Sequence, residues 1–431
     1  MTFICFWMHS MDLLQAQHCS SPTNLSVLPY NASSPQIAID PFGNAIAVWY
    51  QFDGCHLTIQ ASTKLLGGSW QLEPDTLSLS DQDAFNPQIV IDSFGNATVV
   101  WEKYNGSHVI IQASTKLYGG DWQLKPDNLS LSNQNASNPQ IAVDSLGNVV
   151  AIWQRWDGHN NIIQSSTKLF GSNWQIVPDN LSLPGQDAVN AQIAISEYDN
   201  TIVVWQRFDG SHHIIQAVSR FLQEDWQKVP ENISLPGHHA FAPQIAVDSW
   251  GNATVVWNQF DNDYGMIKAS TKLFGGNWQL IPDTLSLPGR NAFFPQIAID
   301  LFGHVTVAWE CYDEKKLRCI QTSTKPFQRN WQAIPDTLSL PGDHNTNVQI
   351  AVDCFGKVMV IWNTSKGFTC IHSSVKPFGG SWQIEPDIIS SLGRSAFFPQ
   401  ISFDPFGNVI IVWVLQDSFS FIQATDKYFI R

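Results

Sequence analysis

The segment "PQIAVDSWGNATVVW" at residues 243–257 contains no arrangement of side chains typical of catalysis, yet near copies of it recur along the chain. They read PQIVIDSFGNATVVW at 87–101, PQIAVDSLGNVVAIW at 139–153 and PQISFDPFGNVIIVW at 399–413. A match this close over fifteen residues indicates one structural unit that is used many times. The repeat is therefore the primary evidence for the fold.

The glutamine of the "PQ" pair marks the frame of the repeat. It recurs every 52 residues, with one interval of 53 and one of 51, at Gln36, Gln88, Gln140, Gln192, Gln244, Gln296, Gln349 and Gln400. Eight copies nearly fill the 431 residues, and no linker or change of composition separates them. The chain is therefore expected to form one large repeat domain rather than two or three separate ones.

Each repeat contains four segments with the signals of a β-strand and none with the period of a helix. In the second copy these segments are residues 87–92, 95–104, 109–117 and 122–131. Four antiparallel strands with a period near 50 residues are typical of the blades of a β-propeller. The fold class predicted is all-β, an eight-bladed β-propeller with four antiparallel strands in each blade.

The two ends of the chain predict how the ring closes. The last repeat stops at "FIQATDKYFIR" (421–431), before its fourth strand, whereas "SPTNLSVLPYNASSPQ" (21–36) matches the fourth-strand segment "KPDNLSLSNQNASNPQ" (125–140). The N-terminal segment is therefore expected to pair with the C-terminal blade. The predicted organisation is an N-terminal extension at 1–19 outside the repeats and a propeller at 20–431.

The motif P-Q-x-A-x-D-x-x-G-N-x-x-x-x-W resembles the repeats of large bacterial β-propeller proteins, which mostly lack an assigned activity. It is more distantly similar to NHL repeats, which share "IAVD-x-x-GN". The resemblance implies the fold, and it favours a secreted or cell-surface location. The opening residues "MTFICFWMHSMDLL" do not indicate a Sec signal peptide, because no Lys or Arg precedes the apolar patch. A misassigned start and another export route both stay open.

Composition limits the partners. The formal net charge of −14 argues against nucleic acid, which needs a basic surface. No apolar run reaches the roughly 18 residues that span a bilayer. Motifs of hydrolases, metalloproteases and phosphate-binding loops are missing from the sequence. We therefore expect no cofactor, no metal and no catalytic residues, and a monomer that binds a protein or glycan partner.

Most recurrent residues have a structural interpretation. The aspartate of "D-x-x-G-N" is expected to bond backbone N–H groups within its turn, and the tryptophan of the second strand to lie in the core. For the tryptophan of the fourth strand, exposure and sugar stacking stay open. The basic residue after the third strand, such as Lys64, is expected to face solvent. The seven cysteines show no CxxC spacing and are interpreted as isolated thiols.

The turns between the second and third strands vary most, and they carry the candidate ligand-binding residues. Six of them begin with an aromatic side chain that is followed by Asp or Asn. Aromatic faces stack on sugar rings or apolar groups, and the polar neighbour can bond hydroxyls or amides. Packing within the hairpin is the alternative role of these side chains. The candidate site consists of Phe52, Tyr104, Trp156, Phe208, Phe260 and Tyr312 with Asp53, Asp157, Asp209 and Asp261, and Asn105 and Asp313 complete the pattern.

Two hypotheses of function follow. The first is a non-catalytic binding or scaffold propeller that recognises a glycan or protein through this variable loop face. The alternative is a hydrolase or lyase acting on glycans, with its site where the central axis meets the same face. Departures from the repeat, such as Lys268 and His372, are scattered over the blades, which favours binding.

Overall fold

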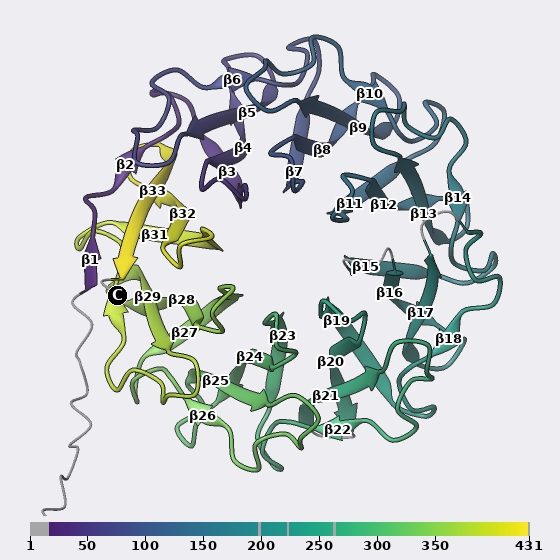
Figure 1. Cartoon of the computed structure of the whole chain (residues 1–431), viewed down its shortest axis with the longest axis vertical. Coiled ribbons are helices and arrows are strands. Elements are labelled where there is room, and N and C mark those ends of the chain that lie inside the picture. Colours follow the sequence, from purple (N-terminus) through teal and green to yellow (C-terminus); the bar gives the residue numbers. More distant parts are fainter. Residues whose placement is uncertain (1–16, 197–199, 222–223, 262–263, 430–431) are drawn as a thin grey trace, which may run out of the picture.

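The computed structural model describes residues 17–196, 200–221, 224–261 and 264–429, and within them the chain forms an eight-bladed β-propeller (Figure 1). Each blade is a separate antiparallel sheet, and the blades stand radially around a central channel. The predicted fold class is confirmed. The described residues contain no helix able to cross a bilayer.

The innermost strand of every blade lies next to the axis (Figure 1). These strands are β3 (Ala32–Ile39), β7 (Ala84–Ile91), β11 (Ala136–Val143), β15 (Ala188–Ile195), β19 (His239–Val247), β23 (Ala292–Ile299), β27 (His344–Val352) and β31 (Ser395–Phe403). The second strands are β4 (Ala45–Phe52), β8 (Ala97–Tyr104), β12 (Val149–Trp156), β16 (Asn200–Phe208), β20 (Ala253–Asp261), β24 (Val305–Tyr312), β28 (Val358–Lys366) and β32 (Val409–Gln416).

The third strands are β5 (Leu57–Lys64), β9 (Val109–Lys116), β13 (Asn161–Lys168), β17 (His213–Phe221), β21 (Tyr264–Lys272), β25 (Arg318–Lys325), β29 (Phe368–Lys376) and β33 (Ser420–Phe429). The outer strands are only two residues long: β2 (Thr23–Asn24), β6 (Asp75–Thr76), β10 (Asp127–Asn128), β14 (Asp179–Asn180), β18 (Glu231–Asn232), β22 (Asp283–Thr284), β26 (Asp336–Thr337) and β30 (Asp387–Ile388). Blade 1 is β3–β6, the next six follow in chain order, and blade 8 is β31–β33 with β2.

The core lies between blades rather than within them. One cluster joins Ile202, Val204 and Ile215 of blade 4 to Val255 and Trp257 of blade 5. All eight second-strand tryptophans are at most 1% exposed, as expected. Of the outer tryptophans, Trp70, Trp122, Trp174 and Trp278 are buried too. Each blade therefore depends on both neighbours to cover its apolar faces.

The inner turn "D-x-x-G-N" is held by its aspartate, as predicted. In blade 1, Asp40 Oδ1 accepts the N–H groups of Phe42 and Asn44 at 2.9 and 2.8 Å, and Asp40 Oδ2 accepts the side-chain amide of Asn44 at 2.8 Å. Gly43 has φ +87°, a conformation that glycine adopts without steric cost. The aspartates of blades 2, 3, 5 and 8 make the same three bonds.

The basic residue after the third strand was expected to face solvent, and this expectation is wrong. Lys64 is 7% and Lys427 is 2% exposed. The ammonium groups reach the neighbouring blade, where Lys168 donates to Thr115 at 3.0 Å and Lys325 donates to Thr271 at 3.2 Å. Several also lie over an outer tryptophan of their own blade, as Lys325 does at 5.7 Å from the Trp331 ring. The long side chain thus forms a hydrogen bond from one blade to the next.

Both termini build blade 8. β2 pairs with β33 through Thr23↔Ala424 and Asn24↔Gln423, as the repeat alignment predicted. A further strand, β1 (Gln17–Cys19), pairs with the end of β33. Three residues that the sequence analysis assigned to the extension therefore join the last sheet, whereas residues 1–16 lie outside the described part.

The closure predicts how truncations behave. Removal of residues 1–30 should lower the melting temperature strongly, because it deletes β1, β2 and the buried Leu25 from blade 8. Removal of residues 1–16 should leave the melting temperature unchanged, since these residues have no counterpart in the repeat. Differential scanning calorimetry of the two truncated chains makes the comparison. Equal melting temperatures would contradict closure by the N-terminal strands.

Burial predicts a large difference between two tryptophans. Trp257→Ala removes a side chain that is 0% exposed and should cost about 3–5 kcal/mol of unfolding free energy. Trp156→Ala removes the same side chain from the end of β12, where it is 44% exposed, and should change the unfolding free energy by no more than about 0.5 kcal/mol. Denaturant midpoints measure both. A reversed order would show that the core is wrongly placed.

Candidate functional site

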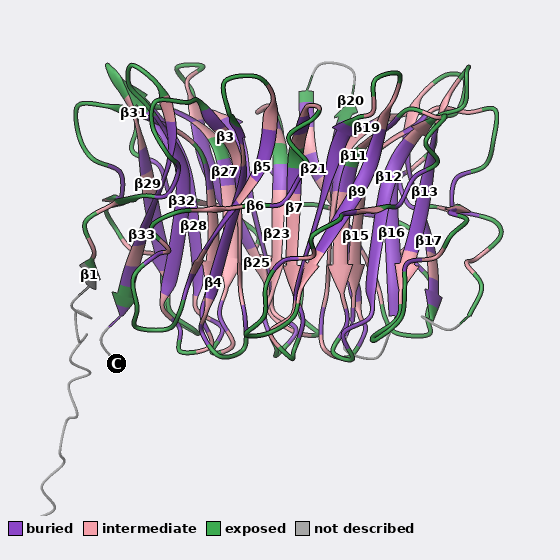
Figure 2. Cartoon of the chain, turned by 90° about the horizontal axis from the view of Figure 1, so that it is seen from above, coloured by how far each residue is buried: buried purple, intermediate pink, exposed green. Residues whose placement is uncertain are grey.

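The turns between second and third strands lie on one face of the disc, the upper face in Figure 2, which we call the variable face. The aromatic side chains predicted there stand at or next to the ends of the second strands. Phe52, Tyr104, Trp156, Phe208 and Phe260 are between 36% and 44% exposed, whereas Tyr312 is half-buried. Their prediction as ligand-binding residues stays a prediction.

The acidic partners of these aromatic side chains have a role within their own turns. Asp157 Oδ1 accepts the N–H groups of His159 and Asn160 at 2.9 and 2.8 Å, and Asp53 and Asp209 make the equivalent bonds. These backbone N–H groups hold the pKa of Asp53, Asp157 and Asp209 below its usual range. Asp261 instead lies 3.8 Å from the His238 ring.

Three of the predicted aromatic residues belong to a continuous band of rings across blades 4 to 6. The contacts run from Phe208 through His213, Phe241, Phe260 and Phe293 to Tyr312, with ring centroids 5.0–6.3 Å apart. His239 adds to the band and accepts the His213 N–H at 3.2 Å. Burial and the neighbouring His239 lower the pKa of His213. The faces of these rings suit a flat ligand.

The central channel is lined by the eight glutamines of the "PQ" pair. Gln36, Gln88, Gln140, Gln192 and Gln244 border one cavity at the axis, and Gln296, Gln349 and Gln400 border another. Two residues before each glutamine the inner strand bulges, and the residue at the bulge has φ between 49° and 56°. The bulge recurs in every blade. Each blade therefore places one side chain at the same position near the axis, and the identity of that residue varies from blade to blade.

The second cavity, which we call the axial cavity, has a volume of about 470 Å³ and differs from the rest of the ring. In blades 6 and 8 the bulge residue is phenylalanine, Phe294 and Phe398, each 53% exposed, on either side of Asn347 in blade 7. The other bulge residues are Ser34, Asn86, Asn138, Asn190 and Ala242. A bulky side chain at φ near +50° is strained, and strain of this kind gathers at functional sites.

The axial cavity also contains an ion pair. Glu310 of β24 is buried, and its Oε2 accepts a hydrogen bond from Arg318 Nη1 of β25 at 2.8 Å. Glu310 Oε1 accepts the backbone N–H of Asn347 in the next blade at 2.7 Å. Burial raises the pKa of Glu310, against the opposing effects of the Asn347 N–H, Arg318 and His344. Phenyl rings, amides and an ion pair thus converge on one cavity.

A disulfide braces the hairpin that carries this ion pair. Cys311 and Cys319 follow Glu310 and Arg318 directly, face each other in the β24–β25 register and are bonded to each other. The interpretation of all seven cysteines as isolated thiols is wrong for these two. A covalent link next to both charged residues limits how far the two strands can move apart.

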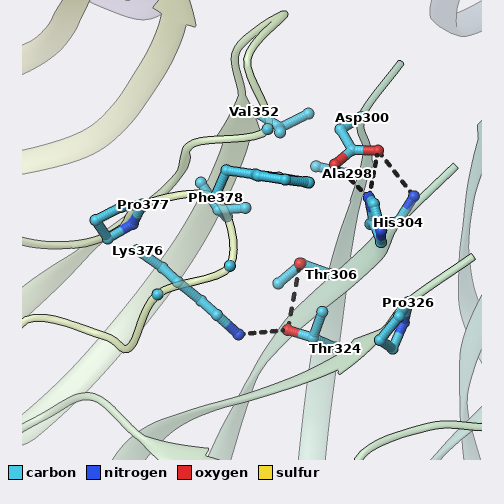
Figure 3. Close-up of a pocket in the computed structure, with 14 residues that line it drawn as sticks. Ala298, Asp300, His304, Thr306, Thr324, Pro326, Val352, Lys376, Pro377 and Phe378 are labelled. Carbon is cyan, nitrogen blue, oxygen red and sulfur yellow. Dashed lines mark hydrogen bonds and ion pairs between the residues drawn. The ribbon is translucent and has the colours of Figure 1, made fainter. Parts of the chain in front are cut away.

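A groove on the opposite face, between blades 6 and 7, is the other departure from the repeat (Figure 3). It has a volume of about 330 Å³, and its wall contains an Asp300–His304 pair at 2.9 Å in place of the usual Asp–Asn pair. Figure 3 shows Lys376 reaching Thr324, to which it donates at 3.2 Å. Lys168 and Lys325 make the same bond in other blades, so this lysine holds the seam between blades.

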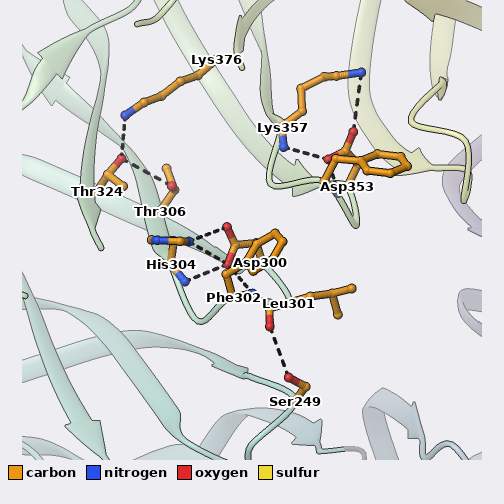
Figure 4. Close-up of polar contacts among 11 residues, drawn as sticks. Ser249, Asp300, Leu301, Phe302, His304, Thr306, Thr324, Asp353, Lys357 and Lys376 are labelled. Carbon is orange, nitrogen blue, oxygen red and sulfur yellow. Dashed lines mark hydrogen bonds and ion pairs between the residues drawn. The ribbon is translucent and has the colours of Figure 1, made fainter. Parts of the chain in front are cut away.

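The groove is wider because a hydrogen bond that recurs in other blades is missing there. In blades 1, 2, 3 and 5 the turn asparagine accepts the N–H of the turn after the third strand, at Leu66, Tyr118, Phe170 and Phe274. His304 and Lys357 replace that asparagine in blades 6 and 7, and Figure 4 shows them bound to Asp300 and Asp353 instead. The polar groups of the groove satisfy one another, so the axial cavity is the stronger candidate.

Sequence reasoning missed Phe294, Phe398, Glu310 and Arg318 as site residues. A signal was present, since "FFPQ" occurs at 293–296 and 397–400, whereas the other six copies have Ser, Asn or Ala two residues before the glutamine. Within the described chain no group of three or more His, Cys, Asp or Glu side chains is arranged to hold a metal ion.

The comparisons with known proteins show the fold alone. No family model matches the chain, and no curated protein matches it. Among solved structures it is similar to a PL25 ulvan lyase, a polysaccharide lyase, at 12% identity over 92% of this chain and 93% of that one, with a TM-score of 0.51, or 0.52 for the lyase bound to a GlcA-containing saccharide. It is also similar to the polysaccharide lyase Uly1, at 7% identity over 77% and 86% of the chains, with a TM-score of 0.51.

Strain at the axial cavity predicts that one substitution stabilises the protein. Phe398→Asn places at the bulge the residue found in blades 2, 3, 4 and 7, which tolerates the left-handed conformation, and should raise the unfolding free energy by about 1 kcal/mol. The reverse change Asn86→Phe should lower it by more than that, because it also removes the hydrogen bond from Asn86 to the buried Glu102. Denaturant midpoints measure both. A loss of stability in Phe398→Asn would show that the phenyl ring is held by packing and not against strain.

Proposed function

We propose that this protein is a carbohydrate-binding propeller whose ligand enters the axial cavity of blades 6 to 8 from the variable face. The observation that carries the proposal is the pair of half-exposed rings, Phe294 and Phe398, that line this cavity in a strained conformation. A bulky ring at this position is explained if the two rings bind a ligand.

The chemistry of the lining fits a polyhydroxylated ligand. Phenyl faces stack on the C–H face of a sugar ring, and the amides of Gln296, Gln349 and Gln400 offer both donors and acceptors to hydroxyl groups. The aromatic band ends beside the cavity, since the rings of Phe293 and Phe294 are 6.3 Å apart. A chain of sugars can therefore extend from the cavity over Phe260 and Phe208, which were predicted from the sequence.

The second candidate function is a glycan-active enzyme with its site at the axis. The observation that favours it is Glu310, a buried carboxyl group at the cavity whose pKa is raised by burial, as is common for general acids and bases. Glycoside hydrolysis commonly needs two carboxyl groups about 5–9.5 Å apart. Among the described residues that line the cavity, Glu310 is the one carboxyl group, and it also holds the seam to Asn347. This arrangement favours binding over hydrolysis.

A glycan array of the purified protein tests the proposal. The wild-type chain should bind one class of oligosaccharide. Phe294→Ala with Phe398→Ala should weaken that binding by roughly 5- to 150-fold, if each ring contributes about 0.5–1.5 kcal/mol. Phe208→Ser with Phe260→Ser should weaken long ligands more than short ones, because these residues lie further from the axis.

The control pair is Phe94→Ala with Phe302→Ala on the opposite face, where Phe94 packs against Phe170 and Phe302 packs against Phe378. Binding should survive these changes. Products released from the bound glycan would favour the enzyme, and capture of a protein in place of any glycan would contradict the proposal.

A further inference from the structure

The arginine of the axial cavity is open to a ligand, whereas the carboxylate that it contacts is not. The side chain of Arg318 is 29% exposed and that of Glu310 is 3% exposed. Both border the cavity, and no other charged side chain does so within the described residues. A group that enters the cavity therefore meets a guanidinium first.

The guanidinium is only partly used by Glu310. Arginine has five N–H donors in a planar fork that matches a carboxylate through two parallel bonds. Here one donor, on Nη1, is given to Glu310 Oε2, and the other oxygen of Glu310 accepts the Asn347 N–H of the next blade. Glu310 therefore holds Arg318 by one bond, and an incoming carboxylate can form two.

Blade 2 shows that the contact between a buried glutamate and the next blade can form without an arginine. Glu102 occupies the position of Glu310 one half-ring away, and its Oε1 accepts the N–H of Asn138 at 2.9 Å and the amide of Asn86 at 3.0 Å. The residue that corresponds to Arg318 is Val109, the first residue of β9. In blade 6 Phe294 takes the place of Asn86 and cannot donate a hydrogen bond, so Arg318 supplies the second bond to the glutamate. It thereby brings to the cavity a positive charge that blade 2 lacks.

We propose that the glycan bound in the axial cavity carries a carboxylate, as a uronic acid does, and that Arg318 binds this group in place of Glu310, which takes up one proton in exchange. The inference rests on the proposed carbohydrate-binding function and names its ligand class. Charge is balanced, because the ligand carboxylate replaces the Glu310 carboxylate on Arg318 and the proton that neutralises Glu310 comes from solvent.

The proton follows from the geometry of the pair. Once Arg318 turns to the ligand, Glu310 would be a buried charge that keeps only the Asn347 N–H, one donor fewer than Glu102 has in blade 2, and this is strongly unfavourable. Arg318 from β25 and the Asn347 N–H and His344 from β27 are the groups that act on Glu310. Burial already raises the pKa of Glu310 with Arg318 in place, and loss of Arg318 raises it further. The bound state therefore holds one more proton than the free state above that pKa.

The test uses the full chain and a panel of uronate oligosaccharides, each paired with the same oligosaccharide after reduction of its carboxyl groups to alcohols. Binding is measured by isothermal titration calorimetry between pH 5 and 8. The carboxylated form should bind more tightly than the reduced form, and its affinity should fall about tenfold per pH unit above the pKa of Glu310.

Three variants separate the steps. Arg318→Gln should bind the carboxylated form no more tightly than the reduced form. Glu310→Gln is a neutral mimic of the protonated state. At every pH it should bind the carboxylated form as tightly as the wild type does below the pKa of Glu310. The matched control Glu102→Gln should retain the pH dependence of the wild type, since it removes the equivalent buried carboxylate of blade 2.

The outcomes distinguish this inference from the function on which it rests. If no member of the panel and no glycan on the array binds, the proposed function fails. If carboxylated and reduced forms bind equally, or if Arg318→Gln weakens both alike, the protein binds glycans but the carboxylate is not recognised, and the inference is overturned. An unchanged pH dependence in Glu310→Gln would overturn the proton exchange.

Discussion

No blade of this protein can bury its own apolar faces. The second strands are apolar on successive residues, and clusters such as that around Trp257 are completed only by the next blade. The ring therefore gains its full stability only when it closes, which makes the short pairing of β2 with β33 more important than its two residues suggest. The other features of the structure depend on this shared burial.

Shared burial also explains why the polar residues of the repeat are so regular. Polar groups near an apolar seam must be satisfied by partners, so each blade presents the same bonds to its neighbour. The third-strand lysines are an example, because they give up contact with water to bond a threonine of the neighbouring blade. The inner-turn glycine recurs for a steric reason: a Cβ on Gly303 would come within 2.7 Å of the Phe327 ring and 3.2 Å of Asp248 Oδ2 in the preceding blade.

A scaffold held so evenly can carry departures at a few positions without losing its fold. The largest departures that reach the axis are in blades 6 and 8, where two phenylalanines occupy bulge positions and one arginine is added beside a buried glutamate. They converge although they come from residues more than 100 positions apart, Phe294 and Phe398. The repeat places equivalent positions around one axis, so substitutions in separate copies become neighbours.

Much of the architecture could be predicted from the sequence, because a repeat reports its own period and its own turn chemistry. The asparagine–aspartate turns, the buried tryptophans and the terminal closure follow from local patterns. The burial of Lys64 could not be predicted, since the partner of that lysine, Asp426, lies 362 residues away in the last blade. The Cys311–Cys319 bond and the Glu310–Arg318 pair depend on strand register across a turn that is longer in blade 6 than in other blades.

The predicted loop aromatics and the axial cavity lie on the same face of the disc. Ring contacts, such as those from Phe260 through Phe293 to Phe294, connect them. The most direct test of the account is a crystal structure of the protein with an oligosaccharide that it binds. The account predicts a sugar ring between Phe294 and Phe398 with an acidic group on Arg318. A sugar bound in the groove beside His304, or only at the outer loops around Trp156, would contradict it.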